Sequence, residues 1–194
     1  MEALYQFSNS ITPISREAFA LVAPHLKHFK CKANTVLCDV GDESKYVFFI
    51  VSGIVRTSTE TKKGKVFTRE LYTKNQFCGP MSDMIKDKPS TYLYETLTDC
   101  EIIRSEHKQV QKLYDSHPEL MRFEIKMLEH AYIKLERTII SLGTKDTKER
   151  YLNLLERLKG IENLIPQYQI ASYLGVTPIQ LSRIRKSLKE EIEQ

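Results

Sequence analysis

The clearest hydrophobic pattern in the chain is a stripe that repeats at alternating spacings of four and three residues. Its members are Met121, Ile125, Leu128, Tyr132, Leu135, Ile139 and Leu142. This spacing keeps the side chains on one face of an α-helix, and a seam of three heptads is typical of a coiled coil. Isoleucine and tyrosine at one core position, with leucine and methionine at the other, favour two parallel helices. The pattern predicts a helix that joins two copies of the chain. The alternative is one long core helix in a monomer.

A second helical pattern, between Pro166 and Lys189, predicts two short helices joined by a turn. Gly175 stands where a tight turn needs a backbone free of a β-carbon. Thr177 and Pro178 then begin the second helix, and Gln180 completes a capping box with Thr177. The apolar positions that fit the buried seam between two crossed helices are Ile170, Ala171, Leu174, Val176, Leu181 and Ile184. This arrangement is a helix-turn-helix.

The outward face of the second helix is basic. If Leu181 faces inward, the roughly 100° turn per residue places Arg183 and Lys186 on the opposite side. Arg183 can donate two hydrogen bonds to the edge of a guanine, whereas Lys186 suits a phosphate. Ile179 either packs on a thymine methyl or is a surface residue without a DNA role. The residues that we expect to contact double-stranded DNA are Thr177, Pro178, Ile179, Gln180, Arg183 and Lys186. The alternative is a charged helix pair that packs on a protein partner.

Between Phe29 and Ser105 the pattern changes to short alternating, aromatic runs separated by turn residues. Many brief strands at close spacing predict a barrel or jelly roll. A helix beginning near Ser15 and another over His107–Asp115 are expected to flank it. The predicted strands are Thr35–Cys38, Tyr46–Val51, Ile54–Thr59, Val66–Tyr72, Tyr92–Leu97 and Glu101–Ser105.

Composition limits the class of protein. The chain has 194 residues, of which 41% are apolar, enough for one good core and a small second one. The net charge is +4, and the segment from Thr177 to Lys189 alone carries four basic residues and no acidic one. Without a signal-like start or a run of about 18 apolar residues, we expect a cytoplasmic protein with no membrane partner.

Cysteine and histidine positions indicate no metal site. The four cysteines are scattered without a paired short spacing, so we expect reduced core residues. The five histidines are expected in helices or at helix ends, and none has the spacing of a paired metal ligand. No nucleophile elbow or phosphate-cradling loop motif is found in the sequence either. We therefore expect no enzymatic activity and no metal.

The order of a barrel, a long dimer helix and a helix-turn-helix resembles the Crp-Fnr family of bacterial transcription factors. Residues 40–42 and 49–53 look like the family's opening turns, and residues 170–188 look like its DNA reader. The resemblance implies an α+β fold with a cyclic-nucleotide-binding-like jelly roll over residues 1–116, a dimerisation helix over 117–143 and a helix-turn-helix domain over 144–194. It places Thr177, Gln180, Arg183 and Lys186 on DNA-contacting positions. The implied partners are DNA, a second copy of the chain, RNA polymerase and a small-molecule effector.

The resemblance also implies a ligand pocket, at Phe77, Gly79, Pro80, Met81, Ser90 and Thr91. Cyclic-nucleotide binders of this fold begin their phosphate loop with Gly-Glu and end it with Arg-Ser or Arg-Thr. Here Pro80 stands in place of the acid and Ser90 in place of the arginine. A phosphodiester without its guanidinium partner loses a charge-assisted pair, so tight binding of a cyclic nucleotide is not expected, unless Lys86 and Lys88 substitute. An unknown small ligand or an empty barrel are the alternatives, and no cofactor is predicted with certainty.

Two functions from different classes follow. The first is a dimeric transcription regulator whose barrel senses a signal and whose dimer helix reorients two DNA readers. The second is a ligand-binding regulatory module whose helical tail binds a protein partner and no DNA.

Overall fold

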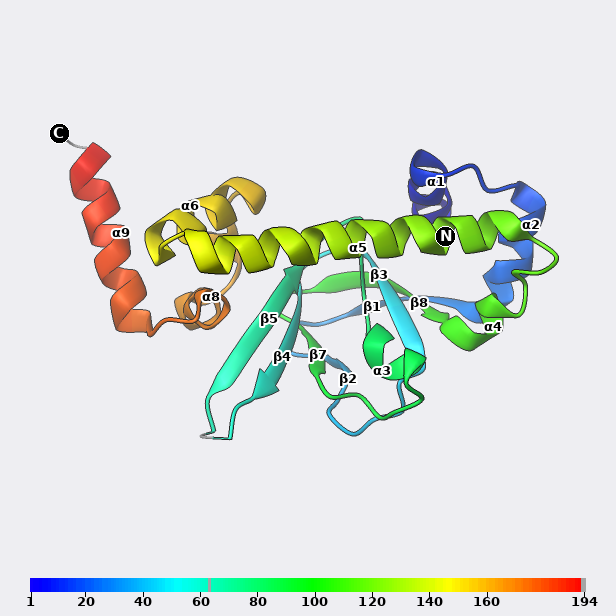
Figure 1. Cartoon of the computed structure of the whole chain (residues 1–194), viewed down its shortest axis with the longest axis horizontal. Helices are drawn as coiled ribbons and strands as arrows, with labels where there is room; N and C mark the ends of the chain where they lie inside the picture. Colours follow the sequence, from blue (N-terminus) through cyan, green and yellow to red (C-terminus); the bar gives the residue numbers. More distant parts are fainter. Residues whose placement is uncertain (63, 193–194) are drawn as a thin grey trace.

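The computed structural model describes residues 1–62 and 64–192. A β-rich domain is followed by one long helix and then by a cluster of shorter helices (Figure 1). The helices are α1 (Glu2–Ile11), α2 (Arg16–Val22), the 3-10 helix η1 (Ala23–His25), α3 (Met81–Ile85), α4 (His107–Gln111), α5 (Pro118–Thr144), α6 (Thr147–Arg157), α7 (Ile161–Leu164), α8 (Gln167–Leu174) and α9 (Pro178–Ile192). The strands are β1 (Leu26–Cys31), β2 (Val36–Cys38), β3 (Tyr46–Ser52), β4 (Val55–Glu60), β5 (Val66–Tyr72), β6 (Gln76–Cys78), β7 (Leu93–Thr96) and β8 (Cys100–Glu106).

The strands form two four-stranded sheets, in the orders β1-β8-β3-β6 and β2-β7-β4-β5. All the pairings are antiparallel. A buried cluster that takes residues from both sheets, including Phe48, Val55, Tyr94 and Ile102, fills the space between them. The predicted jelly roll is confirmed.

Helices cover the domain on its outer side. α1 packs Leu4 against Phe49 and Ile103 of the first sheet. α2 begins after Ser15, as predicted, because the Ser15 hydroxyl accepts a hydrogen bond from the Ala18 amide at 3.0 Å. One expectation is wrong: His28 lies in β1, not in a helix, and its ring nitrogen forms a 2.6 Å hydrogen bond to Glu101.

α5 runs along the length of the molecule (Figure 1). One of its faces packs on the β domain through Leu120, which is buried, and through Phe123, whose ring lies 5.9 Å from the ring of Phe77. Farther along, Lys134 forms a 3.0 Å ion pair with Glu70 on β5. The seam residues point away from this contact, as the next subsection describes.

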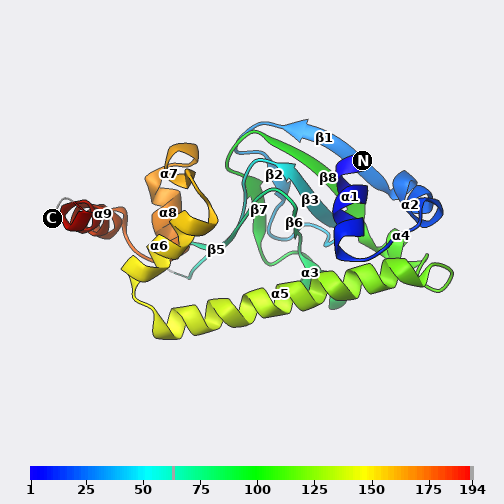
Figure 2. The ribbon, with the colours of Figure 1, turned by 90° about the horizontal axis from the view of Figure 1, so that it is seen from above.

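The carboxyl-terminal helices dock on the second sheet, near β5 (Figure 2). One hydrophobic cluster joins Ile54, Leu71 and Leu97 of the β domain to residues of α6, α7, α8 and α9. Polar contacts border it: the hydroxyls of Thr68 and Ser172 lie 2.9 Å apart. The two parts of the chain therefore share a core.

Candidate nucleic-acid interface and sensor pocket

The turn between α8 and α9 is built by local interactions. Gly175 adopts a φ of +77°, in the left-handed region that favours glycine, and ends α8. At the start of α9 the Thr177 amide donates to Gln180 Oε1 at 2.8 Å, and the Gln180 amide donates to Thr177 Oγ1 at 3.2 Å. This is the reciprocal capping box that the sequence predicts.

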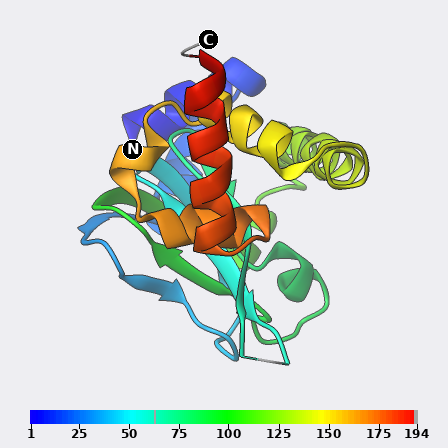
Figure 3. The same cartoon turned by 90° about the vertical axis from the view of Figure 1, so that its left-hand side faces the viewer.

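α9 is two-sided. Leu181 is fully buried in the shared core, and Ile184 and Leu188 pack against that core. On the other side Arg183 is exposed and the Lys186 side chain is 80% exposed. The remaining candidate DNA contacts, Thr177, Pro178, Ile179 and Gln180, are also exposed. Figure 3 shows α9 crossing α8 at the surface of the molecule, with one face open to solvent.

Arg185 plays a different part from its basic neighbours. Its Nε lies 2.9 Å from Glu162 Oε1, and the Tyr151 hydroxyl donates to the same oxygen. The Arg185–Glu162 pair anchors α9 to α7, so Arg185 does not share the outward role expected of Arg183 and Lys186. The opposite end of α9 is tied by Glu191, which accepts from Lys148 Nζ at 2.6 Å. α9 is therefore held in place through charged side chains that are not on its outer face.

The heptad seam of α5 is exposed along its whole length. The seven seam side chains are between 41% and 67% exposed, although all are large and apolar. A shallow groove on this face is lined by Ile125, Leu128, Glu129, Tyr132 and Ile133. Ile133 and Ile140 are also exposed, and they lie beside the seam rather than in it. A monomer with a long core helix would bury this stripe, and here it is unpartnered.

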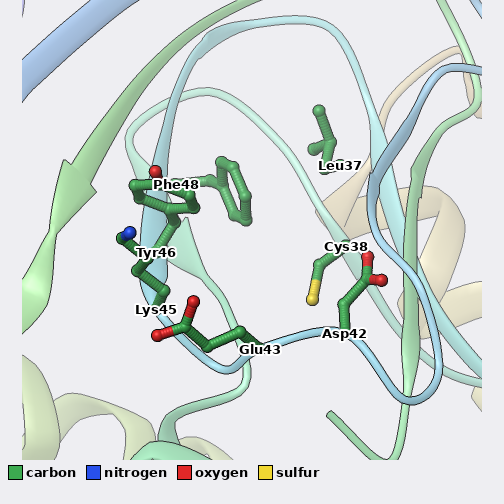
Figure 4. A pocket seen from close by; sticks show the side chains of 7 residues that line it. All are labelled: Leu37, Cys38, Asp42, Glu43, Lys45, Tyr46 and Phe48. Atoms are coloured by element: carbon green, nitrogen blue, oxygen red, sulfur yellow. The ribbon is translucent and has the colours of Figure 1, made fainter. Parts of the chain in front are cut away.

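The β domain contains a pocket of about 250 Å³ (Figure 4). It lies between β2, the β2–β3 loop and β3, and its walls combine apolar, acidic and basic groups. The lining residues are Leu37, Cys38, Asp42, Glu43, Lys45, Tyr46 and Phe48. None of them is in the pocket that the family resemblance implies.

The residues of that implied pocket do not all lie together. Phe77 packs against Phe7, Phe49 and Phe123 in the core beneath α1 and α5. Its neighbour Cys78 points to the opposite face of β6, into the jelly roll. Gly79, Pro80 and Met81 lead into α3, and Ser90 and Thr91 close the loop that follows it.

Asp83 is a buried acidic residue of this loop, and sequence reasoning missed it. Its carboxylate accepts hydrogen bonds from the Thr91 amide and the Thr91 hydroxyl, both at 3.0 Å. The Ser90 hydroxyl, where the family has an arginine, donates instead to the Tyr92 carbonyl at 2.8 Å. The residues present therefore do not fit the phosphate of a cyclic nucleotide. The two Thr91 donors are already bonded to Asp83, and the arginine that would pair with the phosphate is replaced by Ser90.

The cysteines gather in the jelly-roll core, where all four are free thiols. Burial raises the pKa of the Cys78 thiol far above its ordinary value, and burial likewise raises the pKa of Cys38 and Cys100. Buried thiols with raised pKa values stay protonated and are poor nucleophiles or metal ligands. Within residues 1–62 and 64–192, no group of three or more histidine, cysteine or acidic residues is arranged to hold a metal ion. The same residues contain no helix both long and apolar enough to span a bilayer.

Comparisons with known proteins agree with this architecture. Residues 28–117 match the cyclic nucleotide-binding domain family. The chain is 22% identical over 177 residues to the cAMP-activated global transcriptional regulator CRP of Haemophilus influenzae, covering 86% of this chain and 79% of that protein. It is 24% identical over 163 residues to the global nitrogen regulator of a Nostoc species, covering 78% of this chain and 73% of that protein.

Solved structures share the fold over nearly the whole chain. The c-di-GMP-responsive global regulator CLP of Xanthomonas campestris is 17% identical, with a TM-score of 0.71 over 91% of this chain and 93% of that one. A protein from Eubacterium rectale, described as a Crp/Fnr-family transcriptional regulator, is 15% identical, with a TM-score of 0.73 over 92% of this chain and 85% of that one. With a cyclic nucleotide-binding domain, a long helix and a carboxyl-terminal helical unit in this order, the chain is similar over most of its length to regulators of the Crp-Fnr family.

Proposed function

We propose that the protein is a transcription regulator that binds double-stranded DNA as a parallel homodimer, with α9 of each copy in the major groove. In this proposal residues 1–116 are the sensor, residues 117–143 the dimerisation helix and residues 144–194 the DNA-binding unit. The names of the related proteins describe transcriptional regulators, and none describes an enzyme.

The observation that carries the DNA-binding proposal is the polarity of α9. Leu181 is fully buried while Arg183 and Lys186 on the opposite face are exposed. A helix that is anchored by its apolar side and presents a guanidinium outward has the arrangement that direct reading of guanine requires. The exposed amides at the start of α9 add a favourable site for a phosphate.

The dimer proposal rests on the exposed seam of α5. Seven apolar side chains in heptad register form a surface that a second α5 would cover by knobs-into-holes packing. Two copies related by a two-fold axis would present their readers to successive major grooves, about 34 Å apart.

Selection of binding sites from a random duplex pool tests the dimer and the reader together. We expect a two-fold symmetric consensus whose half-site centres are about 10 base pairs apart, and an affinity that falls steeply with salt. A single unpaired half-site would contradict the dimer. Recovery of unrelated sequences with no measurable duplex affinity at low salt would contradict DNA binding and favour a protein partner for the helical tail.

A further inference from the structure

The loop from Gly79 to Thr91 holds a buried carboxylate that DNA binding and dimerisation do not use. Asp83 lies on α3 and is only 4% exposed. Its Oδ2 accepts two hydrogen bonds, one from the Thr91 amide and one from the Thr91 hydroxyl. Hydrogen bonds to an ionised acceptor are among the strong ones, so this contact joins the two ends of the loop.

Backbone amides at the end of the loop and in the facing turn are also used within the chain. The Lys88 amide donates to the Asp83 carbonyl at 2.9 Å, and the Ser90 amide donates to the Asp42 carbonyl at 2.8 Å. The Gly41 amide in turn donates to the Ser90 carbonyl at 2.8 Å. The end of the loop is thus fixed to the β2–β3 turn, which forms one wall of the pocket in Figure 4. These backbone amides are therefore not available to an incoming anion.

The surroundings are unfavourable for an anion as well. Burial raises the pKa of the Cys38 thiol, and the carboxylates of Asp42, Asp39 and Asp83 raise it further. Two acidic side chains, Asp42 and Glu43, and one basic side chain, Lys45, line the pocket beside the loop. A second anion placed there would meet like charges in a partly desolvated site, which is strongly unfavourable without a cationic partner.

We propose that Asp83 is an internal ligand of this loop: its carboxylate takes the place that the phosphate of a cyclic nucleotide takes in the domain family. The sensor domain then holds its loop closed without any nucleotide and excludes anionic ligands from it. Asp83 is in this sense the residue that sets the ligand specificity of the domain. The proposal concerns the sensor alone, so its tests need no DNA.

The test is rescue of a deletion by a small carboxylate. Asp83→Ala leaves the Thr91 donors free beside a vacated space of carboxylate size. We expect the Tm of this full-length variant to fall by about 5 °C or more, and to recover in a saturable manner with sodium acetate but not with sodium chloride at equal ionic strength. Asp87→Asn is the matched control, because Asp87 is in the same loop, its side chain is 84% exposed, and asparagine tolerates its φ of +52°. The wild type and this control are expected to respond to neither acetate nor cyclic AMP.

Two results would overturn the proposal. One is acetate raising the Tm of the wild type as much as that of Asp83→Ala. The other is saturable stabilisation of the wild type by cyclic AMP or cyclic GMP. If Asp83→Ala does not fold, Thr91→Ser and Thr91→Val replace it: serine keeps both donors and is expected to keep the Tm, whereas valine loses the hydroxyl and lowers it. Equal Tm values for these two variants would contradict the role of Asp83.

Discussion

Arg183 and Lys186 both project from the outer face of α9, but a guanidinium and an ammonium act differently on DNA. A planar guanidinium reads the O6 and N7 edge of guanine, so Arg183→Ala is expected to cost about 1–3 kcal/mol of preference for one base pair. Lys186 acts as a point charge toward phosphate, so Lys186→Ala is expected to weaken binding to all sequences alike and to reduce the salt slope by about one. Fluorescence anisotropy with the selected site and with single-base variants, at several salt concentrations, separates the two effects.

The control for both substitutions is Lys112→Ala, which removes a positive charge on the sensor side of the molecule and is expected to leave DNA affinity unchanged. If Arg183→Ala keeps the wild-type ranking of the single-base variants, α9 does not read bases through this side chain. If Lys112→Ala weakens binding as much as Lys186→Ala, the effect is one of net charge and not of position.

Gly175 is required for its conformation rather than for its small size. An added β-carbon would meet no atom within 4 Å, but the φ of +77° is one that other residues adopt at a cost. Gly175→Ala is therefore expected to lower the free energy of unfolding by about 1 kcal/mol. Gly143→Ala is the matched control, because Gly143 has no positive φ and its added β-carbon also meets open space. Urea denaturation measures both, and an equal loss at the two sites would contradict a conformational origin.

At the scale of elements, the exposed apolar seam of α5 is the surface that a partner helix is expected to cover. Leu128 is the third of the seven seam residues and is exposed in the single chain, so a second α5 would bury it. Leu128→Asp would place two carboxylates in the dimer core. We expect it to weaken the dimer by about 4 kcal/mol or more, roughly a thousandfold in the dissociation constant. Light scattering coupled to size-exclusion chromatography measures the change.

The same substitution outside the seam is the control for that experiment. Arg137 is exposed on α5 and lies two residues from Leu135 but in a different heptad position. Arg137→Asp is expected to leave the dimer intact. A monomeric wild type at micromolar concentration would contradict the coiled-coil proposal directly.

Elements with a complete local signal could be predicted from the sequence. α5, α8, α9 and the strands β3, β4, β5, β7 and β8 carry full periodicity or caps, and they are found where the pattern places them. β1 is as long as β4, but it is not among the predicted strands. β6 has three residues, too few to show an alternation, and was not predicted. α1 carries a signal that could have been used, since Leu4, Phe7 and Ile11 recur at helical spacing. Asp83 could not have been identified, because its role depends on a contact with Thr91 that only the folded loop creates.

At the scale of the whole molecule, the β domain and the carboxyl-terminal helices share one core. Leu71 of β5 is fully buried among side chains of the carboxyl-terminal helices, and Thr68 on the same strand contacts Ser172 of α8. These contacts join residues about a hundred positions apart, so no local pattern could predict them. β5 therefore contacts α8 directly, so the β domain and the carboxyl-terminal helices are not connected through α5 alone.

Glu70 is the residue at which the three parts of the chain meet. Its side chain, only 12% exposed, pairs with Lys134 of α5 at 3.0 Å and with Arg157 of α6 at 3.2 Å. Burial holds the pKa of Lys134 below its ordinary value, and Arg157 and Arg69 lower it further, whereas Glu70 opposes this shift. Glu70→Gln keeps the shape but leaves two cations without a counter-charge. Because both cations are about one third exposed, we expect a loss of only about 2 kcal/mol.

The loss of stability caused by Glu70→Gln is expected at the junction of β5 with the carboxyl-terminal helices, not throughout the fold. Hydrogen exchange is expected to speed up in β5 and α8 by roughly thirtyfold, corresponding to about 2 kcal/mol, while β3 and β8 in the jelly-roll core keep their protection. Glu17→Gln, an exposed substitution on α2, is the control and should change neither region. If hydrogen exchange speeds up equally in all the strands, Glu70 stabilises the β domain as a whole. Unchanged exchange in α8 would show that the hydrophobic contact around Leu71 holds the reader in place without the ion pairs.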